Sequence, residues 1–257
     1  MDIFKRLRIP PPAGDGLAAQ ILAALTRGGA SCPEIDALAE RVDGSLGDEI
    51  ECGRLLRFAA IHGHEGMTRA LVEKSGHGKA AMLSVGETRQ TPLMAAASRG
   101  HAPALLALLA GSDLSAQDNN GRTALRHAAQ EGNPNCVRFL LAAHDARGEP
   151  PQDPGLLIEA AKAGCAESVQ LLLARCDARA MDAKGKTALM WAAGNGHADA
   201  VRVLWGPSDL DQKSATGKTA FGYAAGFADE SRRHDAVAVF LEKASEASPR
   251  LKRPRPI

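Results

Sequence analysis

The chain has 257 residues, of which 45% are apolar, and its 31 Lys and Arg residues nearly balance 30 Asp and Glu residues. The formal net charge of +1 argues against binding nucleic acid or an anionic membrane through bulk charge. Five cysteines in a chain of this length do not make a disulfide scaffold. No apolar run approaches the roughly 18 residues of a membrane span. We therefore expect an intracellular, cytoplasmic protein.

The two ends of the chain differ from its middle. Residues 1–14 are basic and then rich in Pro and Gly, so we expect a loose N-terminus. Within residues 15–52, two apolar stripes flank Gly28 and Gly29, which predicts a helical pair that caps the following segment. Residues 246–257 carry four cations among three prolines and predict a disordered basic tail. This tail fits either a nuclear-localisation or nucleic-acid patch or a plain solvated end.

Between these ends the sequence repeats with a period of 32 residues. Threonines stand at 91, 123, 187 and 219, and Gly155 occupies the intervening slot. The chain holds 49 alanines, and an Ala pair follows each of these five positions by five residues. A glycine follows by nine residues in four copies, at Gly100, Gly132, Gly164 and Gly196. Features that keep this register over several copies indicate a repeat protein.

Each copy can be interpreted physically as two short helices. The Thr predicts a helix N-cap, and the glycine predicts the left-handed end of the first helix. An apolar run such as Val137–Leu141 predicts the second helix, and the Ala pair leaves room for close helix contacts. One such unit cannot bury its apolar face alone, so the copies must stack into a solenoid.

The motifs Asp118–Leu125 and Asp182–Met190, with Gly196-His197 after them, resemble the ankyrin repeat family. There is a weaker similarity to ankyrin-only proteins of parasitic protists. The resemblance implies an all-α repeat solenoid of stacked helix-turn-helix units with short β-hairpin or extended tips. It covers about six copies, at residues 53–90, 91–122, 123–154, 155–186, 187–218 and 219–245. The proline-rich link 148–154 replaces one hairpin, and we expect it to be a flexible point.

Motifs that could carry chemistry have simpler interpretations. Gly185-Lys186-Thr187 lacks the first glycine of a phosphate-binding loop, so we expect a hairpin glycine, an exposed lysine and a helix cap. Trp191 shares its repeat position with Tyr223, and the resemblance implies that this position is apolar and buried. The cysteines have no metal-ligand spacing. We expect no cofactor, no bound nucleotide, no metal and no catalytic residue.

The resemblance implies that a protein partner binds the concave face made by hairpin tips and first helices. Arg122, Lys186 and Lys218 each lie between a tip glycine and a cap threonine, so a discontinuous basic ridge is expected. The ridge would fit an acidic segment of the partner, although exposed cations can also serve solubility alone. The candidate partner-binding residues are Arg99, Asn119, Asn120, Arg122, Gln130, Glu131, Lys162, Lys184, Lys186, Asn195, Thr216 and Lys218.

The predicted function is that of a non-catalytic scaffold or adaptor for protein–protein interaction. The alternative is an adaptor that brings substrates to an enzyme complex, such as a ligase, or an effector delivered into another cell. Both alternatives would use residues 1–52 as a second binding surface.

Overall fold

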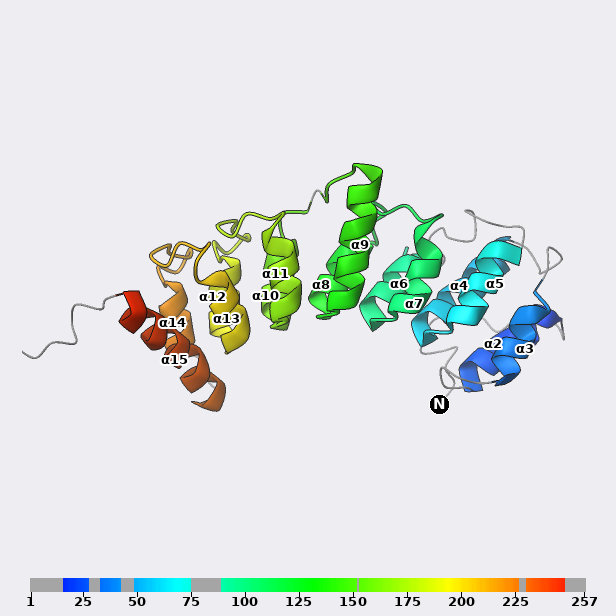
Figure 1. Cartoon of the computed structure of the whole chain (residues 1–257), viewed down its shortest axis with the longest axis horizontal. Helices are drawn as coiled ribbons and strands as arrows, with labels where there is room; N and C mark the ends of the chain where they lie inside the picture. Colours follow the sequence, from blue (N-terminus) through cyan, green and yellow to red (C-terminus); the bar gives the residue numbers. More distant parts are fainter. Residues whose placement is uncertain are drawn as a thin grey trace, which may run out of the picture. The chain divides into compact units, whose positions relative to one another are not determined.

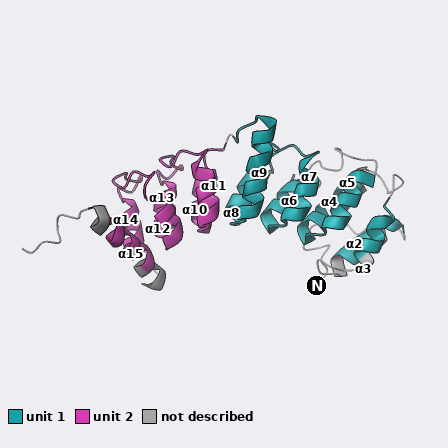
Figure 2. Ribbon diagram, in the orientation of Figure 1, with its two compact units in different colours: residues 1–152 teal, residues 153–257 magenta. Residues whose placement is uncertain are grey.

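A computed structural model describes residues 16–27, 33–42, 49–74, 89–151, 153–226 and 230–247. The chain divides into two compact units, unit 1 (residues 1–152) and unit 2 (residues 153–257) (Figure 2). The predicted loose N-terminus lies outside the described residues. Helix α15 continues to Ala247, two residues into the predicted tail, and the rest of that tail is not described. No described helix is both long and apolar enough to cross a bilayer.

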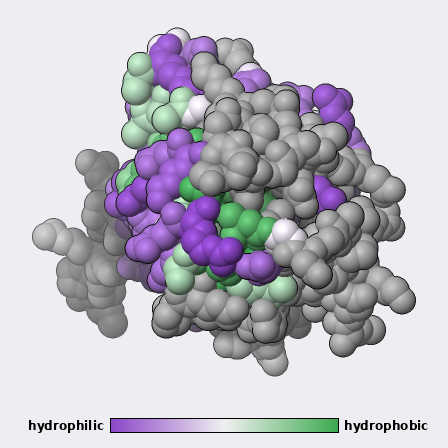
Figure 3. Space-filling view, turned by 90° about the vertical axis from the view of Figure 1, so that its right-hand side faces the viewer, coloured by the Kyte–Doolittle hydropathy of each residue, from purple (hydrophilic) through white to green (hydrophobic). Residues whose placement is uncertain are grey.

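Unit 1 is built from helix pairs in two layers (Figure 1). The first helices stack as α2, α4, α6 and α8, and the second helices stack as α3, α5, α7 and α9. Seen from its α2–α3 end, hydrophilic residues lie beside a smaller hydrophobic area (Figure 3). The bounds are α2 (Leu17–Arg27), α3 (Pro33–Glu40), α4 (Glu49–His62), α5 (Glu65–Lys74), α6 (Pro92–Arg99), α7 (Ala102–Leu109), α8 (Ala124–Gln130) and α9 (Pro134–Arg147).

Unit 2 repeats the same two-layer arrangement. Helices α10, α12 and α14 form the layer of first helices, and α11, α13 and α15 form the second layer. The bounds are α10 (Leu156–Ala163), α11 (Ala166–Leu173), α12 (Ala188–Gly194), α13 (Ala198–Leu204), α14 (Ala220–Ala225) and α15 (Glu230–Ala247). The predicted fold class, an all-α repeat solenoid, is confirmed.

The predicted caps fix where the first helices begin and end. In α6, the Thr91 side chain accepts a hydrogen bond from the Met94 N–H, and Gly100 ends the helix with φ 76°. Thr123, Thr187 and Thr219 cap their helices in the same way. The alanines behind these caps are buried, so the backbones of neighbouring first helices approach closely. This packing explains why alanine is so abundant.

The hairpin tips are turns rather than β-hairpins. Within the described residues, the one isolated β-bridge joins Met181 to Thr187. Each tip closes around a glycine with positive φ, 70° at Gly121 and 67° at Gly185. Of the two predicted tip structures, β-hairpin or extended, the extended one therefore describes the tips better.

Helix α9, which leads into the link 148–154, is longer than the other second helices that precede it. It has 14 residues, compared with 8 in α7, and ends at Gly148 with φ 67°. The Arg147 guanidinium donates to the Ser112 carbonyl over 2.8 Å and also binds the Leu109 carbonyl. These bonds satisfy carbonyl groups at and just beyond the end of α7, so the added helical turns stabilise the preceding helix pair.

Candidate interaction surface

An Asp at each of two tips holds the turn with one carboxylate oxygen. Asp118 Oδ1 accepts the N–H groups of Asn120 and Arg122 over 2.8 and 3.0 Å. Asp182 Oδ1 accepts those of Lys184 and Lys186 over 2.8 and 2.9 Å. The residues between tip glycine and cap threonine are therefore fixed by backbone hydrogen bonds.

The other oxygen of each Asp reaches a side chain nine residues later, on the first helix. Asp118 Oδ2 lies 3.1 Å from His127 Nε2, and Asp182 Oδ2 accepts the Trp191 Nε1–H over 2.8 Å. In the third tip, the Tyr223 hydroxyl lies 3.0 Å from Ser214 Oγ. We call this repeated contact the tip clasp.

The tip clasp turns these helix side chains toward the tip instead of into the core. His127 is buried, but Trp191 and Tyr223 remain half-exposed. The expectation that the two aromatic residues are buried core residues is therefore wrong. The sequence does carry a signal for this placement. Each ring has a polar atom, and a polar tip residue stands nine positions before it.

In unit 1 the tip clasp neutralises the predicted ridge residue Arg122. Its Nη2 lies 2.9 Å from Asp118 Oδ2, and its Nη1 donates to Gln130 Oε1 over 3.4 Å. Burial acts to raise the pKa of Asp118, but hydrogen bonds from Arg122 and Asn120 hold it below its ordinary value. Burial, followed by the Arg122 charge, also lowers the pKa of His127, which favours the neutral ring beside the ion pair. The Arg122 charge is thus engaged within unit 1.

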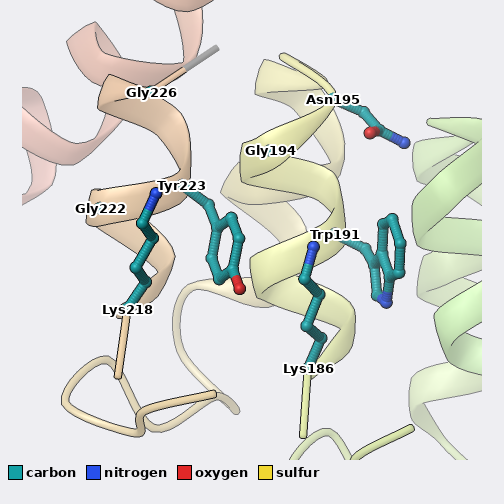
Figure 4. A pocket seen from close by; sticks show the side chains of 8 residues that line it. All are labelled: Lys186, Trp191, Gly194, Asn195, Lys218, Gly222, Tyr223 and Gly226. Carbon is teal, nitrogen blue, oxygen red and sulfur yellow. The ribbon is translucent and has the colours of Figure 1, made fainter. Parts of the chain in front are cut away.

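In unit 2 the corresponding residues form a lysine–aromatic ladder, in which lysines alternate with rings (Figure 4). The ladder consists of Lys162, Trp191, Lys186, Tyr223 and Lys218. Lys186 Nζ lies 4.1 Å from the Trp191 ring centre and 4.2 Å from that of Tyr223. Lys162 Nζ lies 4.8 Å from the Trp191 ring centre, and Lys218 Nζ 5.9 Å from that of Tyr223. All four distances are within the range of cation–π attraction.

The ladder carries positive charge that is not balanced by its own carboxylates. Lys162 pairs with Glu159 over 3.0 Å. In the part of the chain that the structure describes, neither Lys186 nor Lys218 forms an ion pair with a carboxylate. Lys186 is half-buried between its two rings, so the expected exposed lysine at this position is wrong.

Hydrogen bonds fix the ring of Tyr223 within the ladder. Its hydroxyl lies 3.0 Å from both Ser214 Oγ and Thr216 Oγ1. These two bonds, followed by the charges of Lys186 and Lys218, lower the pKa of Tyr223. The ring is therefore held at the tip and separates the two lysines.

A small hollow of about 190 Å³ opens between α12 and α14 beside the ladder (Figure 4). Its walls combine two lysines and two aromatic rings with a base of three glycines and Asn195. The lining residues are Lys186, Trp191, Gly194, Asn195, Lys218, Gly222, Tyr223 and Gly226.

The twelve predicted partner-binding residues divide between the two units. Arg99, Asn119, Asn120, Arg122, Gln130 and Glu131 belong to unit 1, and Lys162, Lys184, Lys186, Asn195, Thr216 and Lys218 belong to unit 2. Among the unit 2 residues, the structure brings Lys186, Lys218 and Asn195 to one hollow. Sequence reasoning missed the aromatic rings that separate these lysines.

Two histidines that follow helix-ending glycines contact backbone carbonyl groups of the preceding repeat. His101 Nε2 lies 3.0 Å from the Ile61 carbonyl oxygen, and His197 Nε2 lies 3.0 Å from that of Lys162. Cys136 is buried, and burial raises the pKa of its thiol to about 11. Across the described residues, no group of three or more His, Cys, Asp or Glu side chains could hold a metal ion.

The stacked helix pairs define the class of the protein as an all-α repeat solenoid. A model of the family "Ankyrin repeats (3 copies)" matches residues 56–150 and 157–252, so the chain belongs to the ankyrin repeat family. Ankyrin repeats generally act as protein–protein interaction modules, and the fold is typically a non-catalytic scaffold.

Comparison with solved structures supports the same fold. The ankyrin repeat domain of Bcl-3, described as a unique member of the IκB protein family, is 22% identical with a TM-score of 0.59. That match covers 89% of this chain and 99% of the other. The ankyrin repeat protein EF0377 is also 22% identical with a TM-score of 0.59, over 73% of this chain and 96% of the other. No curated protein matches the chain.

Proposed function

We propose that this protein is a non-catalytic interaction scaffold whose unit 2 binds an acidic segment of a protein partner on the lysine–aromatic ladder. The observation that carries the proposal is the state of Lys186 and Lys218. Both ammonium groups lie against aromatic rings, and neither pairs with a carboxylate in the described residues. Carboxylates on a partner would supply the missing negative charge.

The rings make these lysines better binding groups than freely moving surface lysines. An exposed lysine loses side-chain entropy when it is held in an ion pair, which is why surface pairs contribute little. Lys186 is already placed between Trp191 and Tyr223, about 4 Å from each ring centre. Part of the ordering cost is therefore met before the partner arrives.

The proposal narrows the predicted ridge to unit 2. Arg122 is excluded because its guanidinium already binds Asp118. Lys184 is exposed at the tip and remains a secondary contact, as does Thr216.

The proposal is tested with the double variant Lys186→Gln/Lys218→Gln. The probe is a labelled eight-residue peptide of alternating Glu and Gly, and the readout is its Kd by fluorescence anisotropy at low salt. We expect Kd to rise about tenfold, since two contacts of about 0.7 kcal/mol each are lost. Binding by the wild type should also weaken as salt increases, because salt screens exposed charges.

The control is Arg179→Gln/Arg202→Gln, which removes the same charge from exposed positions of unit 2 outside the ladder. This variant should retain wild-type affinity apart from a small effect of net charge. Equal losses in the two double variants would mean that the peptide responds to net charge alone, and the proposal would be wrong.

A further inference from the structure

The three glycines at the base of the hollow are not required by the backbone. None of Gly194, Gly222 and Gly226 has the positive φ that favours glycine. A Cβ on Gly194 would lie 3.5 Å from Tyr223 Cβ, and one on Gly222 would lie 3.7 Å from Lys218 Cβ, both ordinary contacts. Glycine within a helix destabilises it by about 0.5–1 kcal/mol relative to alanine. Gly194 and Gly222, which lie within α12 and α14, therefore cost stability without a backbone reason, whereas Gly226 is the C-cap of α14.

The other repeats carry larger residues at the same positions. Gly194 and Gly226 correspond to Ser98, Gln130 and Lys162 in the preceding copies. Gly222 corresponds to residues with long side chains, which are Met94, Arg126, Ile158 and Met190. The hollow therefore exists because side chains are absent at the two repeats that carry the ladder's aromatic rings.

The size and the charge of the hollow limit what can enter it. Its volume of about 190 Å³ is below the roughly 300–1,000 Å³ of small-molecule and cofactor pockets. This leaves room for a single side chain. Lys186 and Lys218 lie at its wall on either side of the Tyr223 ring, so the side chain that fits best is an anion with a short apolar stem.

We propose that the hollow accepts one Glu or Asp side chain of the partner's acidic segment. Its carboxylate binds the exposed ammonium group of Lys218, and its methylene groups pack on the glycine backbone and the Tyr223 ring. Lys186, on the other face of that ring, adds a longer-range attraction. The inference rests on the proposed function and deepens it, because it turns a general attraction for acidic chains into a defined specificity pocket.

The test fills the hollow without changing any charge. Gly194→Gln introduces the residue found at the equivalent Gln130, and glutamine favours a helix more than glycine does, so the fold should be retained. With the Glu-Gly peptide as probe, we expect Kd to rise at least tenfold. The control Gly206→Gln should leave Kd unchanged, since a Cβ on Gly206 meets nothing within 4 Å.

The outcomes separate this inference from the proposed function. If Lys186→Gln/Lys218→Gln weakens binding but Gly194→Gln does not, the pocket is overturned and the proposed function stands. If neither variant weakens binding, both are overturned. A peptide with Gln in place of Glu should bind at least tenfold more weakly. Equal binding of the two peptides would overturn the claim that the hollow recognises a carboxylate. Tighter binding of a phosphoserine peptide would likewise overturn it in favour of a phosphate.

Discussion

The tip aspartates show how one side chain can organise both a turn and a surface. In Asp118 one carboxylate oxygen accepts two backbone N–H groups, and the other contacts His127 and Arg122. Its side chain is 4% exposed, so these contacts are screened little by water. Asp182 uses the same two oxygens but holds Trp191 instead, which leaves the adjacent Lys186 for the ring faces. A change in the clasped residue therefore decides whether the neighbouring cation is engaged or available.

We expect Asp118→Ala to lower the free energy of unfolding of unit 1 by about 2–4 kcal/mol. The substitution leaves the N–H groups of the turn without their acceptor, the buried His127 without its partner and the half-buried Arg122 without its carboxylate. Urea unfolding followed by circular dichroism measures the loss. The comparison is Asp113→Ala in the same unit, where the aspartate is exposed and its Oδ1 accepts from Ser115. That variant should lose about 1 kcal/mol or less, and a comparable loss in both would contradict a special role for Asp118.

Sequence reasoning works well for residues whose role is local. The Thr91 cap and the Gly100 helix end follow from short-range hydrogen bonding and from φ, which depend on a few neighbouring residues. The tip clasp could not be predicted with the same ease, because Trp191 reads as an apolar residue inside a helix. Its placement depends on the hydrogen bond to Asp182 at the tip and on Lys162, which the preceding repeat places over its ring. Such long-range effects have no periodic signature.

At the scale of the helix pair, the helix-ending glycines connect one repeat to the next. Gly164 has φ 76°, and a Cβ there would lie 2.4 Å from His197 Nδ1 of the following repeat. The His197 ring also binds the Lys162 carbonyl oxygen, near the end of the same helix. The sequence predicts the glycine from its backbone conformation alone. The structure adds a second reason, since the next repeat's histidine occupies the space that a side chain would need.

We therefore expect Gly164→Ala to be more destabilising than its φ alone implies. The left-handed conformation costs an alanine about 1–2 kcal/mol, and the displaced His197 loses its hydrogen bond, for a total of about 2–4 kcal/mol. The control is Gly217→Ala, also in unit 2, with φ 74° but no atom within 4 Å of its Cβ. It should lose about 1–2 kcal/mol. Thermal or urea unfolding of both variants checks this, and equal losses would show that the histidine contact contributes nothing.

At the scale of the whole molecule, the two units differ in their titrating groups. Burial lowers the pKa of His62, His64 and His127, all in unit 1. The Nε2 atoms of His62 and His64 are buried without a hydrogen-bond partner in the described residues. In the described part of unit 2, the shifted groups are Asp182, Cys176 and Tyr223. The pKa of Asp182 lies below its ordinary 3.8, and burial first of all raises the pKa of Cys176 above its ordinary 9.0.

This asymmetry predicts that mild acid destabilises unit 1 before unit 2. The folded-state pKa of each shifted histidine lies below its unfolded value near 6.5, so below that pH the unfolded chain binds more protons than the folded one. The stability that these neutral histidines contribute is complete above about pH 6.5 and is lost as the pH falls toward their folded-state pKa. Asp182 in unit 2 acts at lower pH. Because its pKa is depressed, the stability that it contributes is lost only as the pH falls below its ordinary value of 3.8.

The chain provides its own reporters for this difference, since both tryptophans, Trp191 and Trp205, lie in unit 2. Between pH 7.5 and 5, the protection of amides in α4 and α8, relative to their intrinsic exchange rate at each pH, should fall, while tryptophan fluorescence stays constant. His62→Phe keeps the ring contact with Phe58, whose centroid lies 5.0 Å away, and should reduce the acid sensitivity of α4. Simultaneous loss of protection in both units would show that nearest-neighbour coupling through residues 148–154 is strong enough to make the repeats one cooperative block. Independent loss would identify that link, which follows the end of α9, as the boundary between two folding units.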